Sequence, residues 1–522
     1  MSGAHPNVAP TAAAATSAGA RESCQDLADA VAGWFPVISG VTGKPVTHLI
    51  EHLHRDLPGF VWAFNEKTAV ENAVGASIAG TRSCVVMKHN GLGLALDTIT
   101  NAGVHTIGAA LVIVVGDDPD AANSTCVLDS RELAAAARVP ILEPVGNGDV
   151  AATVEMAVTL SEQAKTPVLV RVTPRLHAPC SGGAPAARAG AVIPPALVGE
   201  RHDRAAVAHR LTKLGRVQWQ RLVTMPTFEQ ASASRATETR CACDGTTAVV
   251  AVGAAAECLP DDVCCAVTLR VCWPVPEAVV DFASGHGRVL VVEDSDPQVE
   301  RHLLERTRGG VEILGRTTGH LPPEGSLSSP AVVRALTAPE PDTWETARSK
   351  DGAPADPGVY ATLFEAVAGL HRSGTFVAAD VGSAVRLCYP PYEAADAALC
   401  LGSAISVAGG AARTGQRAVG VIGDYGLLHS GLQSVLEIVT DGLPVLTVVL
   451  ANDTQAQTGG QPVPQADFPA LLTACGIEHI DSWDLDELDA RATFERLSSL
   501  LLGPLPAVAI VRADRRPKPG DV

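Results

Sequence analysis

The chain has 522 residues, enough for roughly two to four domains, and an apolar content of 47% that can fill several hydrophobic cores. Its formal net charge of −18 argues against binding to nucleic acid or to an anionic membrane, since both require basic patches. No apolar run reaches about 18 residues without a charge or a turn residue, so the sequence predicts no membrane span.

The N-terminal residues 1–22 are Ala-rich and lack the basic start and apolar centre of a secretory signal, so we predict a disordered tail. The 13 cysteines are odd in number and scattered, and several lie inside apolar runs. This usage is typical of reduced, buried thiols in a cytoplasmic enzyme. We therefore expect a cytoplasmic protein whose cysteines are reduced.

Residues 23–180 alternate between apolar runs and helical patterns. The runs SCVVMKH, AALVIVVG and TPVLVRV are apolar nearly throughout, which is typical of buried parallel strands. Between them, LGLALDTITNAG and GDVAATVEMAVTLSEQA have the pattern of helices. The alternation predicts a doubly wound α/β domain.

The rest of the chain predicts two more units of the same kind. Residues 181–245 are rich in Ala, Gly, Pro and Arg and are interpreted as a connector with one helix. Residues 246–345 form a middle α/β domain with the strands TTAVVAVG, CAVTLRVC and RVLVVED, and residues 346–358 form a polar linker. Residues 359–522 alternate again, with the strands TFVAADVG, RAVGVIGD, PVLTVVLAND and PAVAIVRA. The predicted fold class is α/β, with three doubly wound parallel-sheet domains in series.

The third unit places an acid and an amide after two consecutive apolar strands. Asp424 follows RAVGVIG and Asn452 follows PVLTVVLA. In a parallel sheet both would lie at the carboxyl edge, where ligands bind. Carboxylate, amide and main-chain oxygens suit Mg²⁺, which usually keeps phosphate ligands, so we predict a diphosphate held with the help of a helix N-terminus near His429 to Leu432. Residues at two ordinary turns would give the same spacing, and this alternative stays open.

The stretch GDYGLLHSGLQSVLEIVTDGLPVLTVVLAND resembles the motif of thiamine-diphosphate-dependent enzymes. The departure is Tyr425 at the third position, a Gly in that motif, followed here by Gly426. The sequence is similar to the large subunit of indolepyruvate:ferredoxin oxidoreductase, where this position also varies. The resemblance implies pyrimidine, middle and diphosphate domains in order. It also implies a metal held by Asp424, Asn452 and the main-chain oxygen of Thr454, with Gly423, Tyr425 and Gly426 beside the cofactor.

A second motif lies in the first unit. FNEKTAVENAVGASIAG contains Asn65, Glu66 and Gly75 at the spacing that thiamine enzymes use for the acid beside the aminopyrimidine ring. The resemblance makes Glu66 the residue that activates the cofactor. Such a carboxyl requires an apolar pocket, because burial raises its pKa. The alternative for Glu66 is an acid in the first turn of a helix, favoured by the helix dipole.

Two further stretches fit the same family. ALCLGSAISVAGGAA resembles the segment that holds the cofactor bent, which implies that Leu401 is the wedge and Gly402 follows it. MKHNGLGLALD resembles the family stretch that places His89 near cofactor and substrate. A core Leu before a helix and a structural His after a strand are the alternatives.

The loop SGVTGKPVTHLIEHL corresponds to the Gly-rich first loop of the family, in which Gly40, Thr42 and Gly43 would approach the cofactor. An ordinary turn between a strand and a helix is the alternative. Among the cysteines, Cys241, Cys243, Cys264 and Cys265 lack C-x-x-C pairs, so buried thiols are favoured over a metal site.

The chemistry follows from the resemblance and from the cysteines. The similar oxidoreductases carry cysteine runs for iron–sulfur clusters, whereas only Cys475 follows Asn452 here. We therefore expect decarboxylation of a 2-oxo acid, such as the aryl pyruvate indolepyruvate, and attack of the enamine on an acyl thioester or aldehyde, giving an acyloin. His89 and His429 are candidates for proton transfer. The sequence is also similar to the stand-alone acyloin synthases of bacterial carbazole alkaloid biosynthesis.

Three alternatives remain: an oxidoreductase subunit that works with a separate iron–sulfur partner, a simple decarboxylase, and a non-catalytic scaffold. The resemblance also implies where the cofactor binds. Glu66 of the first domain and Asp424 of the third must face opposite ends of one cofactor, and in similar proteins these domains belong to different chains. We therefore expect a homodimer with two shared sites.

Overall fold

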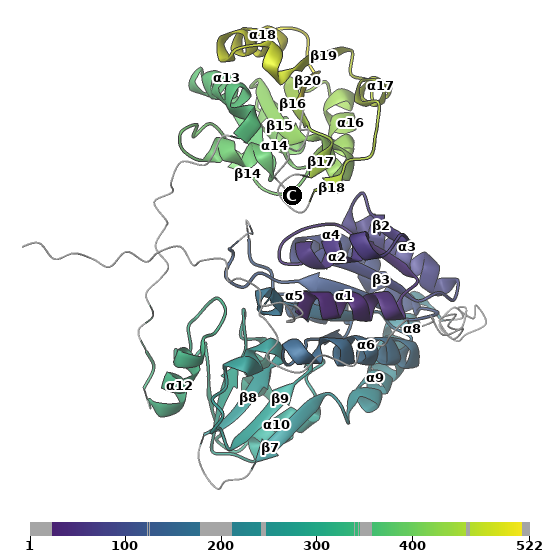
Figure 1. Ribbon diagram of the computed structural model, residues 1–522, viewed down its shortest axis with the longest axis vertical. Coiled ribbons are helices and arrows are strands. Elements are labelled where there is room, and N and C mark those ends of the chain that lie inside the picture. Colours follow the sequence, from purple (N-terminus) through teal and green to yellow (C-terminus); the bar gives the residue numbers. More distant parts are fainter. Residues whose placement is uncertain are drawn as a thin grey trace, which may run out of the picture.

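The computed structural model describes residues 23–177 except 123 and 125, and residues 211–241, 247–338, 340–342, 344, 358–455 and 460–513. These residues form sheets of seven, five and six strands and a small sheet of two. The large sheets are parallel except where β10 pairs with β5 and β7 pairs with β9. In Figure 1 the third domain lies at the top, the first in the centre and the middle domain at the bottom. The predicted α/β class is confirmed.

The first domain is a sheet covered on both faces. Its strand order is β10-β5-β6-β4-β3-β1-β2. Helices α1, α2 and α6 pack on one face and α3, α4 and α5 on the other, because the strands present apolar side chains to both sides. The elements are α1 Ser23–Trp34, β1 Val37–Gly40, α2 Thr47–Asp56, β2 Phe60–Trp62, α3 Glu66–Ile78, β3 Ser83–Lys88, α4 His89–His105, β4 Leu111–Gly116, α5 Ser130–Ala137, β5 Ile141–Leu142, α6 Val150–Ala164 and β6 Val168–Val172.

The middle domain differs from the sequence-based boundaries in two places. The run expected as one strand divides into β9, in the middle sheet, and β10, which joins the first-domain sheet. Strand β7, inside the expected connector, forms the edge of the middle sheet, whose order is β12-β11-β8-β9-β7. The elements are α8 Lys213–Trp219, the π-helix Gln220–Thr224, α9 Met225–Ser232, β7 Thr237–Cys241, β8 Ala248–Val252, β9 Cys265–Leu269, β10 Val271–Trp273, α10 Glu277–Ser284, β11 Arg288–Val292, α11 Gln298–Arg306, β12 Glu312–Leu314 and α12 Ser329–Thr337.

Buried ion pairs join the first and middle domains. Arg131 is fully buried, and its guanidinium contacts Asp129 at 2.6 Å and Glu293 of the middle domain at 2.7 Å. Arg171, also buried, donates to Ser295 of the middle domain at 2.8 Å. Although burial raises the pKa of the Asp129 carboxyl, the two arginines bring it down to about 2. Breaking such contacts would leave charges without partners in the interior, so the two domains are held firmly together.

The third domain has the sheet order β14-β13-β15-β16-β20-β19. None of the helices in the described ranges is both long enough and apolar enough to cross a membrane. The elements are α13 Ala361–Arg372, β13 Phe376–Ala379, β14 Ala397–Ala398, α14 Ala404–Ala412, β15 Ala418–Gly423, α15 Asp424–Gly426, the π-helix Leu427–Gly431, α16 Leu432–Thr440, β16 Val445–Ala451, β17 Thr454–Gln455, β18 Gln461–Pro462, α17 Phe468–Ala474, β19 His479–Asp484, α18 Ala490–Leu502 and β20 Ala507–Arg512.

The cysteines correct one expectation. Cys241 and Cys265 form a disulfide, and Cys264 is also disulfide-bonded, so these residues are not reduced thiols. Cys241 is exposed because it ends the edge strand β7. Cys243 lies outside the described residues. Among the free cysteines that the structure describes, the buried ones are Cys24, Cys84, Cys258 and Cys272.

Candidate active site

A cavity of about 520 Å³ lies where the first and third domains meet. It is formed at the carboxyl ends of strands, the edge of a parallel sheet at which ligands bind. From the first domain its walls include Thr42, Gly43, Lys44, Glu66, Lys88 and Asn90. From the third domain they include Asp380, Ser383, Tyr389, Cys400, Leu401, Gly423, Asp424, Tyr425, Gly426, Asn452, Thr454 and Gln455.

Most of the residues predicted from the sequence line this cavity. The residues that do not are Gly40, His89, Gly402 and His429. Gly40 lies in β1, where a Cβ would come within 2.8 Å of the main-chain oxygen of Val86. The glycine therefore allows β1 to approach β3, and no cofactor contact is needed to explain it.

Asp424 and Asn452 lie side by side as expected, because β15 and β16 are adjacent parallel strands. The Oδ2 atom of Asp424 accepts hydrogen bonds from the main-chain N–H groups of Asn452 and Asp453, both at 2.8 Å. Its Oδ1 atom accepts from the N–H of Tyr425, also at 2.8 Å. Burial raises the pKa of Asp424 to about 6, although these N–H groups lower it.

The oxygen atoms around Asp424 fit a magnesium ion. The carboxylate of Asp424, the amide of Asn452 and the segment of Thr454 line one wall. On the same wall the Oε1 atom of Gln455 is buried without a hydrogen-bond partner among the described residues. A cation would neutralise the buried carboxylate and satisfy unpaired oxygen, and Mg²⁺ prefers these ligand types.

The helix after β15 begins earlier than expected. It starts at Asp424 and runs as α15, a π-helix and α16 to Thr440, so its N-terminus lies at Asp424 and not near His429 to Leu432. The expected N-terminus falls inside the π-helix Leu427–Gly431. The positive end of the helix dipole therefore lies at this first turn, which contains the predicted metal ligand Asp424.

Glu66 begins α3 and points into the interface between the first and third domains, which we call the seam. Asn65 caps this helix, since its side chain accepts a hydrogen bond from the N–H of Thr68. Glu66 is only 8% exposed, and its Oε2 atom lies within hydrogen-bond distance of Nε2 of His429, at 2.8 Å. A Cβ on Gly91 would lie 2.2 Å from Cγ of Glu66, so that glycine makes room for the acid.

His429 does not line the cavity but holds the acid that does. Besides its contact with Glu66, its main-chain oxygen accepts a hydrogen bond of 2.9 Å from the side chain of Asn65. Both partners belong to the first domain. His429 therefore positions Glu66 from the third domain.

Tyr425, the departure from the family motif, also joins the two domains. Its buried hydroxyl donates to the main-chain oxygen of Ala63 at 3.2 Å and accepts from Nε2 of Gln461 at 3.2 Å. Gln461 in turn donates to Ala63 at 3.0 Å, and its Oε1 atom accepts from the N–H of Thr42 at 3.3 Å. A glycine at position 425 would have no side chain to make this contact.

His89 is fully buried behind the cavity wall, which corrects its expected place near the cofactor. Its Nδ1 and Nε2 atoms each lie 3.2 Å from a main-chain oxygen, of Gly116 and Cys126. Burial lowers its pKa, so the ring is neutral near pH 7. His89 holds a loop to the end of β4, while its neighbours Lys88 and Asn90 reach the cavity.

Asp380 is a site residue that the sequence did not indicate. It follows β13, and its Oδ1 atom accepts from the N–H of Gly402 at 2.8 Å, while Oδ2 is buried with no partner among the described residues. Burial raises its pKa to about 7. Leu401 lines the cavity next to it, as expected of the wedge. The strand-end position that indicated Asp424 would have indicated Asp380 too.

The comparisons with known proteins agree with this site. Residues 380–490 match the family described as "Thiamine pyrophosphate enzyme, C-terminal TPP binding domain". Together with the acid at the facing wall, this match defines a thiamine-diphosphate-dependent enzyme, for which Mg²⁺ is the usual partner ion.

Over most of its length this enzyme resembles indolepyruvate oxidoreductase subunit IorA. It is 29% identical over 505 residues to that subunit from Methanothermobacter thermautotrophicus, covering 86% of this chain and 78% of the relative. It is 25% identical over 461 residues to the subunit from Archaeoglobus fulgidus, covering 80% and 73%.

Two solved structures are more distant. The 2-oxoglutarate:ferredoxin oxidoreductase of Magnetococcus marinus has a TM-score of 0.45 and 16% identity, covering 61% of this chain and 64% of that chain. The 4-hydroxybenzoylformate decarboxylase of Rhodococcus jostii RHA1 has a TM-score of 0.29 and 18% identity, covering 94% and 98%.

Proposed function

We propose that the enzyme decarboxylates a 2-oxo acid and joins its acyl carbon to the carbonyl carbon of an acceptor, with an acyloin as product when the acceptor is an aldehyde. The observation that carries the proposal is that Glu66 and the Asp424–Asn452 pair line one cavity from opposite domains. When bound, thiamine diphosphate would supply a nucleophilic carbon for the keto carbon of the donor and a ring that delocalises the electron pair left by carbon dioxide. The names of the relatives support a donor of the indolepyruvate type.

The residues on each wall of the cavity then have distinct roles in binding and in proton transfer. Glu66, held by His429, would contact the pyrimidine ring and exchange a proton with it through its carboxyl oxygen. Asp424, Asn452 and the main-chain oxygen of Thr454 would hold the metal and, through it, the diphosphate. Lys44 and Lys88 line the first-domain wall, where their charge would attract an anionic donor.

In the joining step one carbon–carbon bond forms between the donor's keto carbon and the acceptor's carbonyl carbon. With an aldehyde, the acceptor oxygen takes a proton and carbon dioxide is the only by-product, so no external oxidant is needed. With an acyl thioester, the carbon–sulfur bond breaks, the thiolate leaves and the product is an α-diketone. Asp380 is the cavity acid whose pKa, raised by burial to about 7, suits proton exchange at neutral pH. We propose Asp380 in place of His89 for this proton.

Product analysis tests the proposal. The protein loaded with thiamine diphosphate and Mg²⁺ is incubated anaerobically with indolepyruvate, with and without a panel of aldehydes and acyl thioesters. We expect carbon dioxide release and, by mass spectrometry, a product that contains both donor and acceptor carbons: an α-hydroxyketone from an aldehyde, or an α-diketone and free thiol from an acyl thioester. Release of carbon dioxide together with only the aldehyde derived from the donor would mean that the enzyme is a simple decarboxylase. Absence of carbon dioxide release from every 2-oxo acid tested would overturn the proposed function.

A second candidate function is supported by the similarity to IorA over 86% of this chain. In this function the chain is one subunit of a 2-oxo acid oxidoreductase, and a separate iron–sulfur protein accepts the electrons. A low-potential dye added to the same incubation separates the two functions. Reduction of the dye that depends on the 2-oxo acid and on coenzyme A, without acyloin, would favour the oxidoreductase.

We also propose that the enzyme is a homodimer with shared sites. Large apolar side chains are exposed in the first and third domains, on or next to helices of both: Phe64, Ile78, Leu94, Leu399 and Leu436. A second chain that covers them would remove apolar surface from water. In a shared-site dimer, the contact that one chain makes here between its first and third domains forms between the two subunits.

A further inference from the structure

The middle domain gathers two sulfurs and an imidazole that the proposed reaction does not use. Antiparallel pairing of β7 with β9 sets Cys241 opposite Cys265, and the two are joined as a disulfide. The Nε2 atom of His286, between α10 and β11, lies 3.2 Å from the sulfur of Cys265 and 3.9 Å from that of Cys241. In Figure 1, β7 lies at the opposite end of the molecule from the third domain. The cluster is therefore separate from the candidate active site.

The orientation of His286 indicates a ligand. Its Nδ1 atom lies 2.7 Å from the main-chain oxygen of Phe282, which can only accept, so Nδ1 carries the proton. In the neutral ring the lone pair then resides on Nε2 and faces two disulfide sulfurs, which have no proton to donate. Histidines that bind metals have this arrangement, with one ring nitrogen donating to a carbonyl and the other directed at the ion.

We propose that Cys241 and Cys265, once reduced, bind a thiophilic divalent cation of the Zn²⁺ type together with His286. All three candidate ligand atoms already lie within 4.8 Å of one another. Ligands about 2.0–2.3 Å from a tetrahedral zinc ion lie about 3.5–3.8 Å apart, close to the distances that Nε2 has here from the two sulfurs. The sulfurs reach the same spacing by rotation of their side chains, and water takes the fourth position.

The cation can bind only after the disulfide between Cys241 and Cys265 is reduced, and we assign the role of reductant to a small thiol. Two thiol molecules reduce the disulfide to two cysteine thiols and become a disulfide themselves. Each cysteine then loses its proton to solvent as its sulfur binds the cation. The disulfide and the bound cation therefore exclude each other, and the reduced, metal-free dithiol is the state between them.

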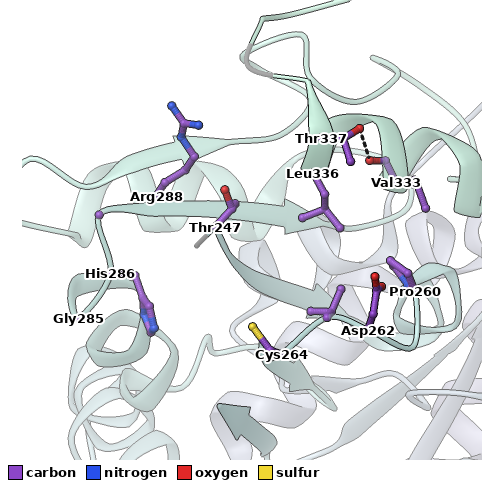
Figure 2. A pocket seen from close by; sticks show the side chains of 12 residues that line it. Thr247, Pro260, Asp262, Cys264, Gly285, His286, Arg288, Val333, Leu336 and Thr337 are labelled. Carbon is purple, nitrogen blue, oxygen red and sulfur yellow. Dashed lines mark hydrogen bonds between the residues drawn. The ribbon is translucent and has the colours of Figure 1, made fainter. Parts of the chain in front are cut away.

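The ion has a path from solvent. A pocket of about 890 Å³ opens at the amino ends of β8, β9 and β11, and His286 is one of its walls. Figure 2 shows His286 and Cys264 on this pocket, with Thr247 and Arg288 beside them. Cys241 itself is exposed. An ion therefore reaches the cluster without opening the fold.

Cobalt titration tests the site. The full-length protein is reduced with a phosphine under anaerobic conditions, its thiols are counted, and Co²⁺ is added. We expect about one equivalent to bind with a sulfur-to-cobalt charge-transfer band, which added Zn²⁺ removes. A Mg²⁺ site has oxygen ligands and gives no such band, so the signal is independent of the proposed function.

Variants locate the signal. Cys241→Ser and Cys265→Ser should abolish the band, and His286→Ala, at a partly exposed position that preserves the fold, should weaken Co²⁺ binding at least about tenfold. Cys475→Ser, which removes a free cysteine of the third domain, should leave the band intact. Fully reduced protein without the band, or a band that all three cluster variants retain, would overturn the proposal.

Discussion

At the scale of single residues, the site depends on two buried carboxyl groups and one positioned acid. Asp424 and Asp380 both have pKa values raised by burial, to about 6 and about 7. Glu66 is instead fixed by a hydrogen bond with His429. A cation or a proton would neutralise the two buried carboxyl groups. The position of the Glu66 carboxyl group is instead set by its contact with His429.

Replacing Glu66 by Gln should preserve the fold and cofactor binding but reduce turnover on the order of 100-fold or more, because only proton exchange is removed. Carbon dioxide release from a 2-oxo acid measures the loss. Glu71→Gln, on the exposed side of the same helix, is the control and should be fully active. Decarboxylation at near-normal rate in Glu66→Gln would mean that another group activates the cofactor.

Removing the Asp424 carboxylate by Asp424→Ala should abolish Mg²⁺-dependent binding of thiamine diphosphate, because the diphosphate loses the bridging charge. Isothermal titration calorimetry measures the affinity with and without Mg²⁺. Asp441→Ala, at the exposed end of α16, is the matched control and should bind normally. Unchanged affinity in Asp424→Ala would remove this residue from the metal site.

The buried Asp380 should make the cofactor-free enzyme less stable as pH rises. Its folded pKa of about 7 lies above the ordinary 3.8, so its favourable contribution is complete below about pH 4 and is lost as pH rises to about 7. Asp380→Asn should therefore stabilise the protein above pH 7, by up to about 4 kcal/mol, and have no effect near pH 4. Denaturant unfolding across this range measures the difference, with exposed Asp97→Asn as the control. A gain that is equal at every pH would contradict this origin.

At the scale of elements, the long helix from Asp424 to Thr440 and the pair α3 and α4 form the seam. The helix carries the metal ligand at its start and His429 in its π-helix, so one element serves both ends of the site. Helix α4 packs against α3 and provides the glycine under Glu66. π-helical turns often occur at functional positions, and this one contains a residue that crosses the seam.

Two glycines in α4 offer a paired test. Gly91→Ala should expel the Glu66 side chain, because the added Cβ would lie 2.2 Å from its Cγ. Gly93→Ala meets nothing closer than 3.9 Å and should leave activity intact. Both changes favour the helix by up to about 1 kcal/mol, so thermal unfolding separates a lost site from a lost fold. Equal activity of the two variants would contradict the role given to Gly91.

The sequence predicted the central strands well and the edges of the sheets poorly. Strands such as β4 and β8 are buried at every position, so their apolar runs are unambiguous. Strand β7 is polar and mostly exposed, and β10 continues an apolar run into another sheet, a crossing that no local pattern encodes. Asp424 and Asn452 were indicated by their strand-end positions and by the motif, and Glu66 by its motif. Asp380 also follows a strand, whereas Gln461 acts through contacts with Thr42 and Ala63, which are distant in the sequence.

At the scale of the whole molecule, the three domains are joined in two different ways. Buried ion pairs connect the first and middle domains, whereas the described contacts of Glu66, Tyr425 and Gln461 connect the first and third by hydrogen bonds. The second connection is the one that we propose to form between subunits.

Mixing Glu66→Gln chains with Asp424→Ala chains tests the shared site. In a hybrid dimer with shared sites, both defects fall in one site and the other site is intact, so activity should recover to about half of wild type per hybrid dimer. Each variant alone, carried through the same subunit exchange, is the control. If each chain completes its own site, as the single chain does in this structure, no activity returns despite proven exchange.

The buried ion pairs have a consequence for how the cofactor enters. Arg131 pairs with Glu293 and Arg171 donates to Ser295, so separation of the first and middle domains would break a buried ion pair and a buried hydrogen bond. The third domain is held at the seam by hydrogen bonds, each of which contributes about 0.5–1.5 kcal/mol net. Loading and release of thiamine diphosphate are therefore expected to occur by displacement of the third domain as a unit. The residence time of the cofactor then reports the strength of that one seam.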